Sequence, residues 1–137
     1  MRAVFADTFY WVALTNPADR YYRSVITRKD EIADSSIFTT GAVLSEFLTF
    51  FAGEKRLRDR AGRTVKALLE DPGIHVIPES RQTFLSGLEL YRARPDKGYS
   101  LTDCVSMQTM SREGLTDVVG SGSVGIRERD DIVTAPE

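Results

Sequence analysis

Short apolar runs alternate along this chain with longer stretches whose apolar residues recur at helical spacing, and this alternation limits the possible folds most. The short runs lack a regular apolar–polar alternation, which is typical of strands that helices cover on both faces. Strands that alternate with helices indicate a mainly parallel sheet. We therefore expect an α/β fold with strands over 3–6, 35–39, 74–77 and 115–119.

The stretches between the strands carry helix signals at both ends. Thr8, Thr40 and Ser100 stand where a capping hydroxyl is preferred, and Asp71-Pro72-Gly73 is a strong turn signal. The spacing predicts helices over 8–14, 18–33, 40–51, 54–70, 80–93 and 100–113. A chain of 137 residues has the length of one domain.

The last part of the chain breaks the pattern. Glycine and serine alternate from Gly120 to Gly125, and charges alternate over 127–131. We expect one domain over 1–119, followed by an atypical and irregular C-terminal tail over 120–137.

Scarce residue types exclude several kinds of site. His75 is the only histidine and Cys104 the only cysteine, so sites with two imidazoles or several thiolates are excluded. No run approaches the ~20 apolar residues that cross a bilayer, and the first residues do not form a signal peptide. We expect a cytoplasmic protein. The net charge is -2, so any nucleic-acid binding must be local.

Three carboxylates have unusual neighbours. Asp7 ends an apolar strand, Glu46 lies in an otherwise uncharged apolar helix, and Asp103 lies in the first turn of the helix that begins at Ser100. An acid among apolar residues is costly unless it is paired or binds a cation. One interpretation is a cluster of acids that binds a hard divalent cation. The alternative is that Asp7 and Asp103 cap helices and Glu46 lies at the edge of an apolar face.

A second signal is the excess of cations in the segment 54–66. Such a helix can bind phosphates electrostatically, or it can be a solvated face with local ion pairs. Both interpretations stay open for its cations, which include Lys55, Arg56, Arg58, Arg60 and Arg63.

Taken together, the motifs resemble the PIN-domain family, specifically the VapC-type toxins of type II toxin–antitoxin systems. The resemblance covers residues 1 to about 119. Its pieces are Val4-Phe5-Ala6-Asp7-Thr8-Phe9-Tyr10-Trp11, Thr39-Thr40-Gly41-Ala42-Val43-Leu44-Ser45-Glu46 and Tyr99-Ser100-Leu101-Thr102-Asp103-Cys104. It implies a three-layer α/β/α sandwich whose acids meet at the carboxyl edge of the sheet.

The resemblance also implies an endoribonuclease that cleaves RNA with Mg²⁺ or Mn²⁺. Asp7, Glu46 and Asp103 would hold the metal, with Thr8 and Asp96 as weaker site candidates. The implied partners are an RNA substrate such as tRNA or rRNA, a cognate antitoxin and a second copy in a homodimer.

The end of the chain departs from the family pattern. A further acid usually follows the fourth strand, and Gly122 stands at the corresponding position. This favours an alternative in which the protein is a degenerate, catalytically weak or inactive module that still binds RNA or antitoxin. A phosphotransfer enzyme with Asp7 as nucleophile is weaker, because Phe9 stands where a second Asp is wanted.

Overall fold

The computed structural model describes residues 2–120 and 125–128, and it confirms the alternation of strands and helices. The strands are β1 (Ala3–Ala6), β2 (Ser36–Thr40), β3 (Ile74–Ile77), β4 (Asp117–Gly120) and β5 (Gly125–Glu128). The helices are α1 (Thr8–Thr15), α2 (Tyr22–Glu31), α3 (Gly41–Phe50), α4 (Lys55–Glu70), α5 (Arg81–Ala93) and α6 (Leu101–Glu113).

The sheet has the strand order β3-β2-β1-β4-β5. Strands β1 to β4 are parallel, and β5 pairs with β4 in the antiparallel direction. The chain moves outward from β1 to β3 and then returns to the other side of β1. The point where this direction changes lies between β1 and β4. Open α/β sheets generally bind their ligands at such a point, outside the carboxyl ends of the strands.

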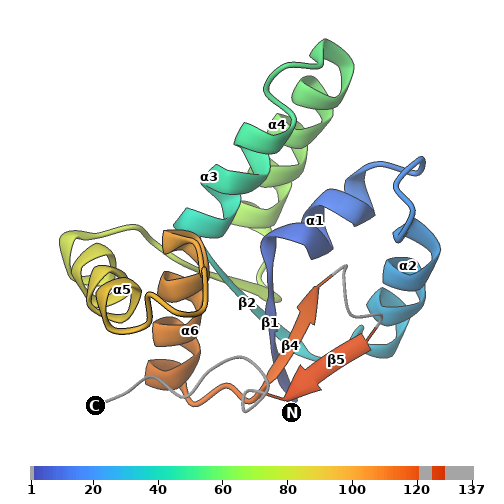
Figure 1. Cartoon of the computed structure of the whole chain (residues 1–137). Coiled ribbons are helices and arrows are strands. Elements are labelled where there is room, and N and C mark those ends of the chain that lie inside the picture. Colours follow the sequence, from blue (N-terminus) through green and yellow to red (C-terminus); the bar gives the residue numbers. More distant parts are fainter. Residues whose placement is uncertain (1, 121–124, 129–137) are drawn as a thin grey trace.

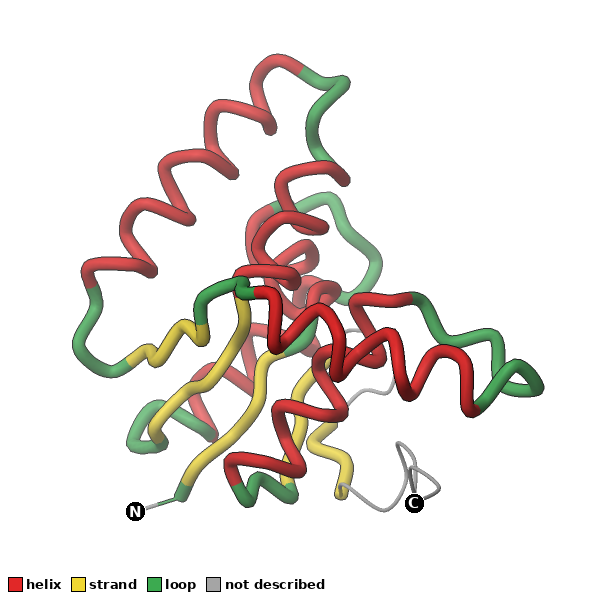
Figure 2. Tube along the Cα trace, turned by 90° about the vertical axis from the view of Figure 1, so that its left-hand side faces the viewer, coloured by secondary structure: helices red, strands yellow, loops and turns green. Residues whose placement is uncertain are grey.

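Helices lie on both sides of the sheet, as the three-layer prediction requires. Helices α5 and α6 lie on one side, and α1 and α2 lie on the other (Figure 1). Helices α3 and α4 project beyond the carboxyl edge of the parallel strands, which is also seen in the turned view of Figure 2. The first turns of α1, α3 and α6 lie toward that edge, and α3 contacts both α1 and α6 (Figure 1).

Apolar burial explains the position of the sheet. Val4, Phe5 and Ala6 of β1 are completely buried and pack with residues of α1, α3 and β4 in the main core. A smaller cluster of Leu90, Cys104 and Met107 joins α5 to α6. The prediction that apolar runs without alternation are covered on both faces is thereby confirmed for β1.

Two predicted segments differ in the structure. The helix expected over 18–33 begins only at Tyr22, because the side chains of Asn16 and Asp19 accept hydrogen bonds from the N–H groups of Ala18 and Tyr21 and form turns instead. The prediction of an irregular tail from residue 120 is wrong for Gly125–Glu128. This segment forms strand β5 and pairs with β4. Backbone pairing with β4 stabilises this strand without an apolar run. The rest of the tail lies outside the described residues.

Within the described residues, every helix is too short or too polar to traverse a lipid bilayer.

Candidate functional site

Asp7 stands at the carboxyl end of β1, beside β4. Its backbone N–H donates to the carbonyl of Val119 at 3.0 Å, which ties it to the neighbouring strand. Its Oδ1 accepts a hydrogen bond from the N–H of Thr8 at 2.8 Å and so caps α1. Asp7 therefore has the capping role left open by the sequence and also lies where the strand order changes direction.

The hydroxyl of Thr39 fixes the backbone that leads into Asp7. Thr39 is completely buried, donates to the carbonyl of Ala6 at 3.0 Å, and accepts a hydrogen bond from the indole Nε1 of Trp11 at 3.4 Å. Ala6 directly precedes Asp7, so this contact holds the end of β1 in place relative to β2 and α1.

Glu46 lies in the second turn of α3 and is half-buried. It lines a cavity of about 670 Å³ between the first turns of α3, α5 and α6. Thr102, the neighbour of Asp103 in the chain, lines the same cavity. Glu46 and the first turn of α6 thus border the same cavity, although Asp103 itself is not among its lining residues.

Asp103 caps its own helix. Its Oδ2 accepts a hydrogen bond from the N–H of Ser100 at 3.0 Å, while Oγ of Ser100 accepts one from the N–H of Asp103 at 3.0 Å. This reciprocal pair is a capping box. It fixes the first turn of α6, and with it the carboxylate, at the carboxyl edge.

Two buried hydroxyls next to these acids have no hydrogen-bond partner among the described residues. They are Oγ1 of Thr8, which follows Asp7, and Oγ of Ser106, which lies one turn after Asp103 on the same helix face. A buried hydroxyl without a partner is costly, and water or a hydrated ion commonly supplies the missing bond.

In the described ranges, no three or more Asp, Glu, His or Cys side chains lie together as a preformed metal site. Asp7 and Asp103 are each directed toward a helix cap, and Gly122, where the family pattern has an acid, lies outside those ranges. The donor types still fit Mg²⁺ or Mn²⁺, which prefer oxygen ligands. Because Mg²⁺ usually retains several waters, unpartnered hydroxyls next to carboxylates fit a hydrated cation.

Asp96 lies apart from these acids in the exposed loop between α5 and α6. Its carboxylate accepts hydrogen bonds from Nε and Nη2 of Arg94 at 3.2 Å and 3.3 Å. These bonds hold the pKa of Asp96 below its ordinary value. The ion pair gives Asp96 a local structural role.

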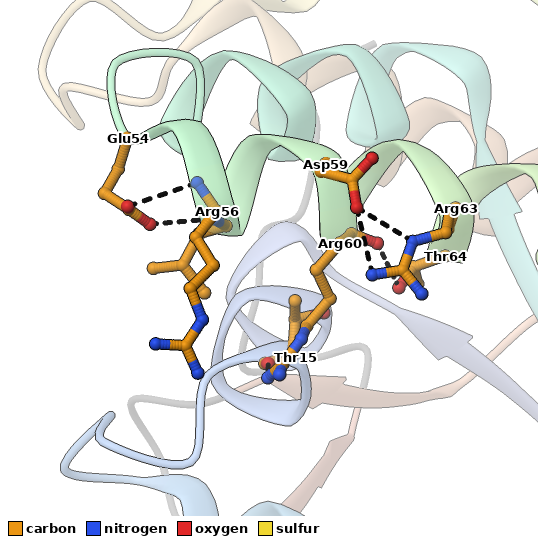
Figure 3. A network of polar contacts seen from close by, with 8 residues as sticks. Thr15, Glu54, Arg56, Asp59, Arg60, Arg63 and Thr64 are labelled. Carbon is orange, nitrogen blue, oxygen red and sulfur yellow. Dashed lines mark hydrogen bonds and ion pairs between the residues drawn. The ribbon is translucent and has the colours of Figure 1, made fainter.

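The basic helix α4 has the local polar contacts of one interpretation, while phosphate binding by its cations stays a prediction (Figure 3). Arg60 donates from Nη1 to the carbonyl of Thr15 at 3.1 Å, and Arg63 forms an ion pair with Asp59 at 3.0 Å. Arg58 donates to the carbonyl of Ala52 at 2.9 Å. The Arg60 contact joins α4 to α1, and the Arg58 contact joins α4 to the turn that precedes α4. Lys55 and Arg56 are exposed in the first turn.

The single cysteine and the single histidine both pack against neighbouring side chains. Cys104 is completely buried between α5 and α6, and burial raises the pKa of its thiol. His75 is exposed on β3 and its ring stacks on Phe38 at a centroid distance of 4.7 Å.

Sequence reasoning missed Ser106 and Glu79. Ser106 could have been found from its position three residues after Asp103 in a helix. Glu79 follows the end of β3 by two residues and lines the same cavity as Glu46. The rule that functional groups gather at the carboxyl ends of strands would have found it.

The comparisons with known proteins agree with this fold. The family model of the PIN domain matches residues 4–122. The chain belongs to the PIN-domain family. No curated protein matches it in sequence.

Two solved structures of VapC toxins have a similar fold. VapC20 of Mycobacterium tuberculosis, described as a toxin that cleaves the sarcin–ricin loop, has a TM-score of 0.75 and 21% identity, over 88% of this chain and 92% of that chain. VapBC2 of Rickettsia felis, bound to a DNA fragment from its promoter, has a TM-score of 0.61 and 17% identity, over 85% of each chain. The predicted three-layer PIN-like fold is confirmed.

Proposed function

We propose that this PIN-domain protein is a metal-dependent endoribonuclease of the VapC type. The observation that carries the proposal is the position of Asp7, which ends β1 where the strand order changes direction and is followed by the unpartnered hydroxyl of Thr8. The similarity to a VapC toxin that cleaves ribosomal RNA supports RNA as the substrate.

Asp7, Glu46 and Asp103 would hold Mg²⁺ or Mn²⁺, and the hydroxyls of Thr8 and Ser106 would bind water around it. A divalent cation bound there lowers the pKa of a coordinated water and offsets charge on the phosphate. The capping bonds of Asp7 and Asp103 orient their carboxylates on rigid helix ends. No histidine is needed as a base, which suits a chain whose single histidine stacks on Phe38.

The RNA backbone would contact the exposed cations of α4. Lys55 and Arg56 are the best placed, because Arg58, Arg60 and Arg63 already bond to groups of this chain. A guanidinium has five N–H donors, so these three arginines can still add positive charge along the helix.

The proposal includes protein partners. VapBC2 of Rickettsia felis supports a cognate antitoxin for this chain. We also propose a homodimer and a cytoplasmic site of action, with tRNA or rRNA as the target.

Asp7→Asn tests the proposal, because an Asn side chain keeps the size and can keep the cap to Thr8 while losing the charge. We expect wild-type protein to cleave RNA with Mg²⁺ or Mn²⁺ and to stop in EDTA, and Asp7→Asn to lose at least about 100-fold in rate. Asp30→Asn, an exposed acid on α2, is the matched control. Metal-dependent cleavage that survives in Asp7→Asn would remove the proposal.

The degenerate binding module stays a second candidate, because Gly122 replaces an acid and the described residues hold no group of three metal-binding side chains. Calorimetric titration with Mn²⁺, paired with a cleavage assay, separates the two candidates. Binding of RNA or antitoxin without cleavage in Mn²⁺ favours the degenerate module.

A further inference from the structure

The cavity beside Glu46 has a chemistry that the proposed nuclease does not yet use. Its volume of about 670 Å³ lies in the range of small-molecule sites. Three helices and the loop before α5 form its walls. The lining residues are Ala42, Ser45, Glu46, Thr49, Glu79, Ser80, Thr83, Phe84, Leu101, Thr102 and Val105.

The walls combine an aromatic ring, apolar side chains and hydrogen-bond acceptors. Phe84 is 51% exposed as a residue, and Leu101 and Val105 line the same cavity. Glu79 and Glu46 supply carboxylates, and none of the described residues that line it is Lys or Arg. A phosphate would be repelled here. A flat, uncharged group with hydrogen-bond donors is the complementary ligand.

The wall that carries Glu79 is fixed by a close approach to Gly41. A Cβ atom on Gly41 would lie 2.9 Å from Cγ and 3.1 Å from the backbone N of Glu79. Only glycine lets the loop after β3 come this near to the start of α3. Oγ of Ser45 also donates to Oε1 of Glu79 at 3.5 Å. The carboxylate is therefore held at the cavity.

The opposite wall is fixed by Gly87. A Cβ atom there would lie 2.5 Å from Cγ2 and 3.2 Å from the backbone N of Val105. This close packing of α5 on α6 positions Phe84, one turn before Gly87, at the same cavity as Val105. The cavity is built by two close contacts and does not depend on a ligand for its shape.

We propose that this cavity is a nucleobase subsite, which takes the base of an RNA nucleotide next to the scissile phosphate. The base stacks on Phe84 and donates a hydrogen bond from an exocyclic amino group to Glu79. Single-stranded RNA is commonly recognised by stacking on aromatic side chains, and a carboxylate accepts from the amino group of cytosine. This inference rests on the proposed function, since Glu46 links the cavity to the metal site.

Uracil has a carbonyl where cytosine has its amino group, so the subsite discriminates between two bases of similar size. The test is fluorescence anisotropy with labelled pentacytidylate and pentauridylate in EDTA. Wild-type protein is expected to bind pentacytidylate at least about 5-fold more tightly. Glu79→Gln is expected to bring the ratio of the two affinities near one. An amide side chain can accept from the amino group of cytosine and can also donate to the carbonyl of uracil. Phe84→Ala is expected to weaken the binding of both RNAs by about 5- to 150-fold.

Helix α5 offers matched controls for both variants. Tyr91 is an aromatic residue with 50% exposure outside the cavity, and Glu89 is an exposed acid outside it. Tyr91→Ala and Glu89→Gln are expected to bind both RNAs like the wild type. Equal losses of RNA affinity in Tyr91→Ala and Phe84→Ala would overturn the subsite. An unchanged preference for pentacytidylate in Glu79→Gln would overturn it too.

Phe84 could instead contact another protein chain, and the same variants decide this. If Phe84→Ala changes the molar mass in solution and leaves RNA binding unaltered, the subsite is overturned and the ring belongs to a protein interface. Binding is measured without metal, so absent cleavage with the expected binding pattern would contradict only the nuclease. Cleavage without that pattern would contradict only the subsite.

Discussion

At the scale of single residues, Asp7 and Asp103 cap helices with the same carboxylates that we propose as metal ligands. The caps at Thr40 and Ser100 could be read from the sequence, as could the capping roles of Asp7 and Asp103. The cap expected at Thr8 is wrong, because Thr8 is the first residue of α1 and Asp7 caps the helix instead. The role of the buried hydroxyl of Thr39 could not be read from the sequence, because its partners Ala6 and Trp11 come from distant parts of the chain. Hydrogen bonds between strands are set by register, which local patterns do not specify.

Tyr10 gives a residue-scale prediction for alkaline pH. Burial raises its pKa from 10.0 to about 12, because the charged phenolate is poorly solvated in the core. A pKa raised by folding contributes stability below pH 10 that is lost as the pH rises toward 12. The free energy of unfolding should fall by about 1 kcal/mol between about pH 8 and 11 through this group.

Urea unfolding of Tyr10→Phe across that pH range checks the prediction. The variant should lose less stability toward alkaline pH than the wild type. Tyr91→Phe, whose ring is 50% exposed, should follow the wild type. If the free energy of unfolding falls with pH equally in Tyr10→Phe and in the wild type, the Tyr10 phenol does not cause the alkaline loss of stability.

At the scale of elements, apolar spacing located α3 to α6 because each combines a helical pattern with a cap or a turn signal. It overextended α2, where Asn16 and Asp19 form turns with their own side chains. It missed β5, whose Gly125–Glu128 has no apolar run and is defined by pairing with β4. Elements that depend on a distant partner are the ones that local pattern leaves out.

Two glycines in helices give an element-scale prediction with opposite signs. Gly87→Ala places a methyl group 2.5 Å from Val105 Cγ2, so α5 and α6 must separate, at a cost of about 1–3 kcal/mol. Gly62→Ala in α4 meets nothing within 4 Å and gains helix propensity of about 0.5–1 kcal/mol. Urea midpoints should move down for the first and up for the second. If the urea midpoint of Gly87→Ala equals that of the wild type, α5 and α6 are not tightly packed at this point.

At the scale of the whole molecule, the parallel sheet determines which distant residues meet. The sequence predicted this sheet from its apolar runs, and the carboxyl-edge rule places Asp7 at that edge. The resemblance to PIN domains is what implies that Glu46 and Asp103 meet it there. The sequence left the capping role of Asp103 open and gave no sign of the cavity between Glu46 and Glu79, so both became clear only in the structure.

Metal binding at this edge predicts stabilisation of the entire fold. A cation that binds only the folded state raises the free energy of unfolding by about 2.7 kcal/mol at a hundred times its Kd, which corresponds to roughly 10 °C in Tm for a domain of this size. Thermal unfolding with Mn²⁺, against KCl of equal ionic strength, measures this shift. Glu46→Gln should lose most of it, because one negative ligand is gone, whereas Glu89→Gln on exposed α5 should retain it. Equal shifts in the two variants would place the cation elsewhere.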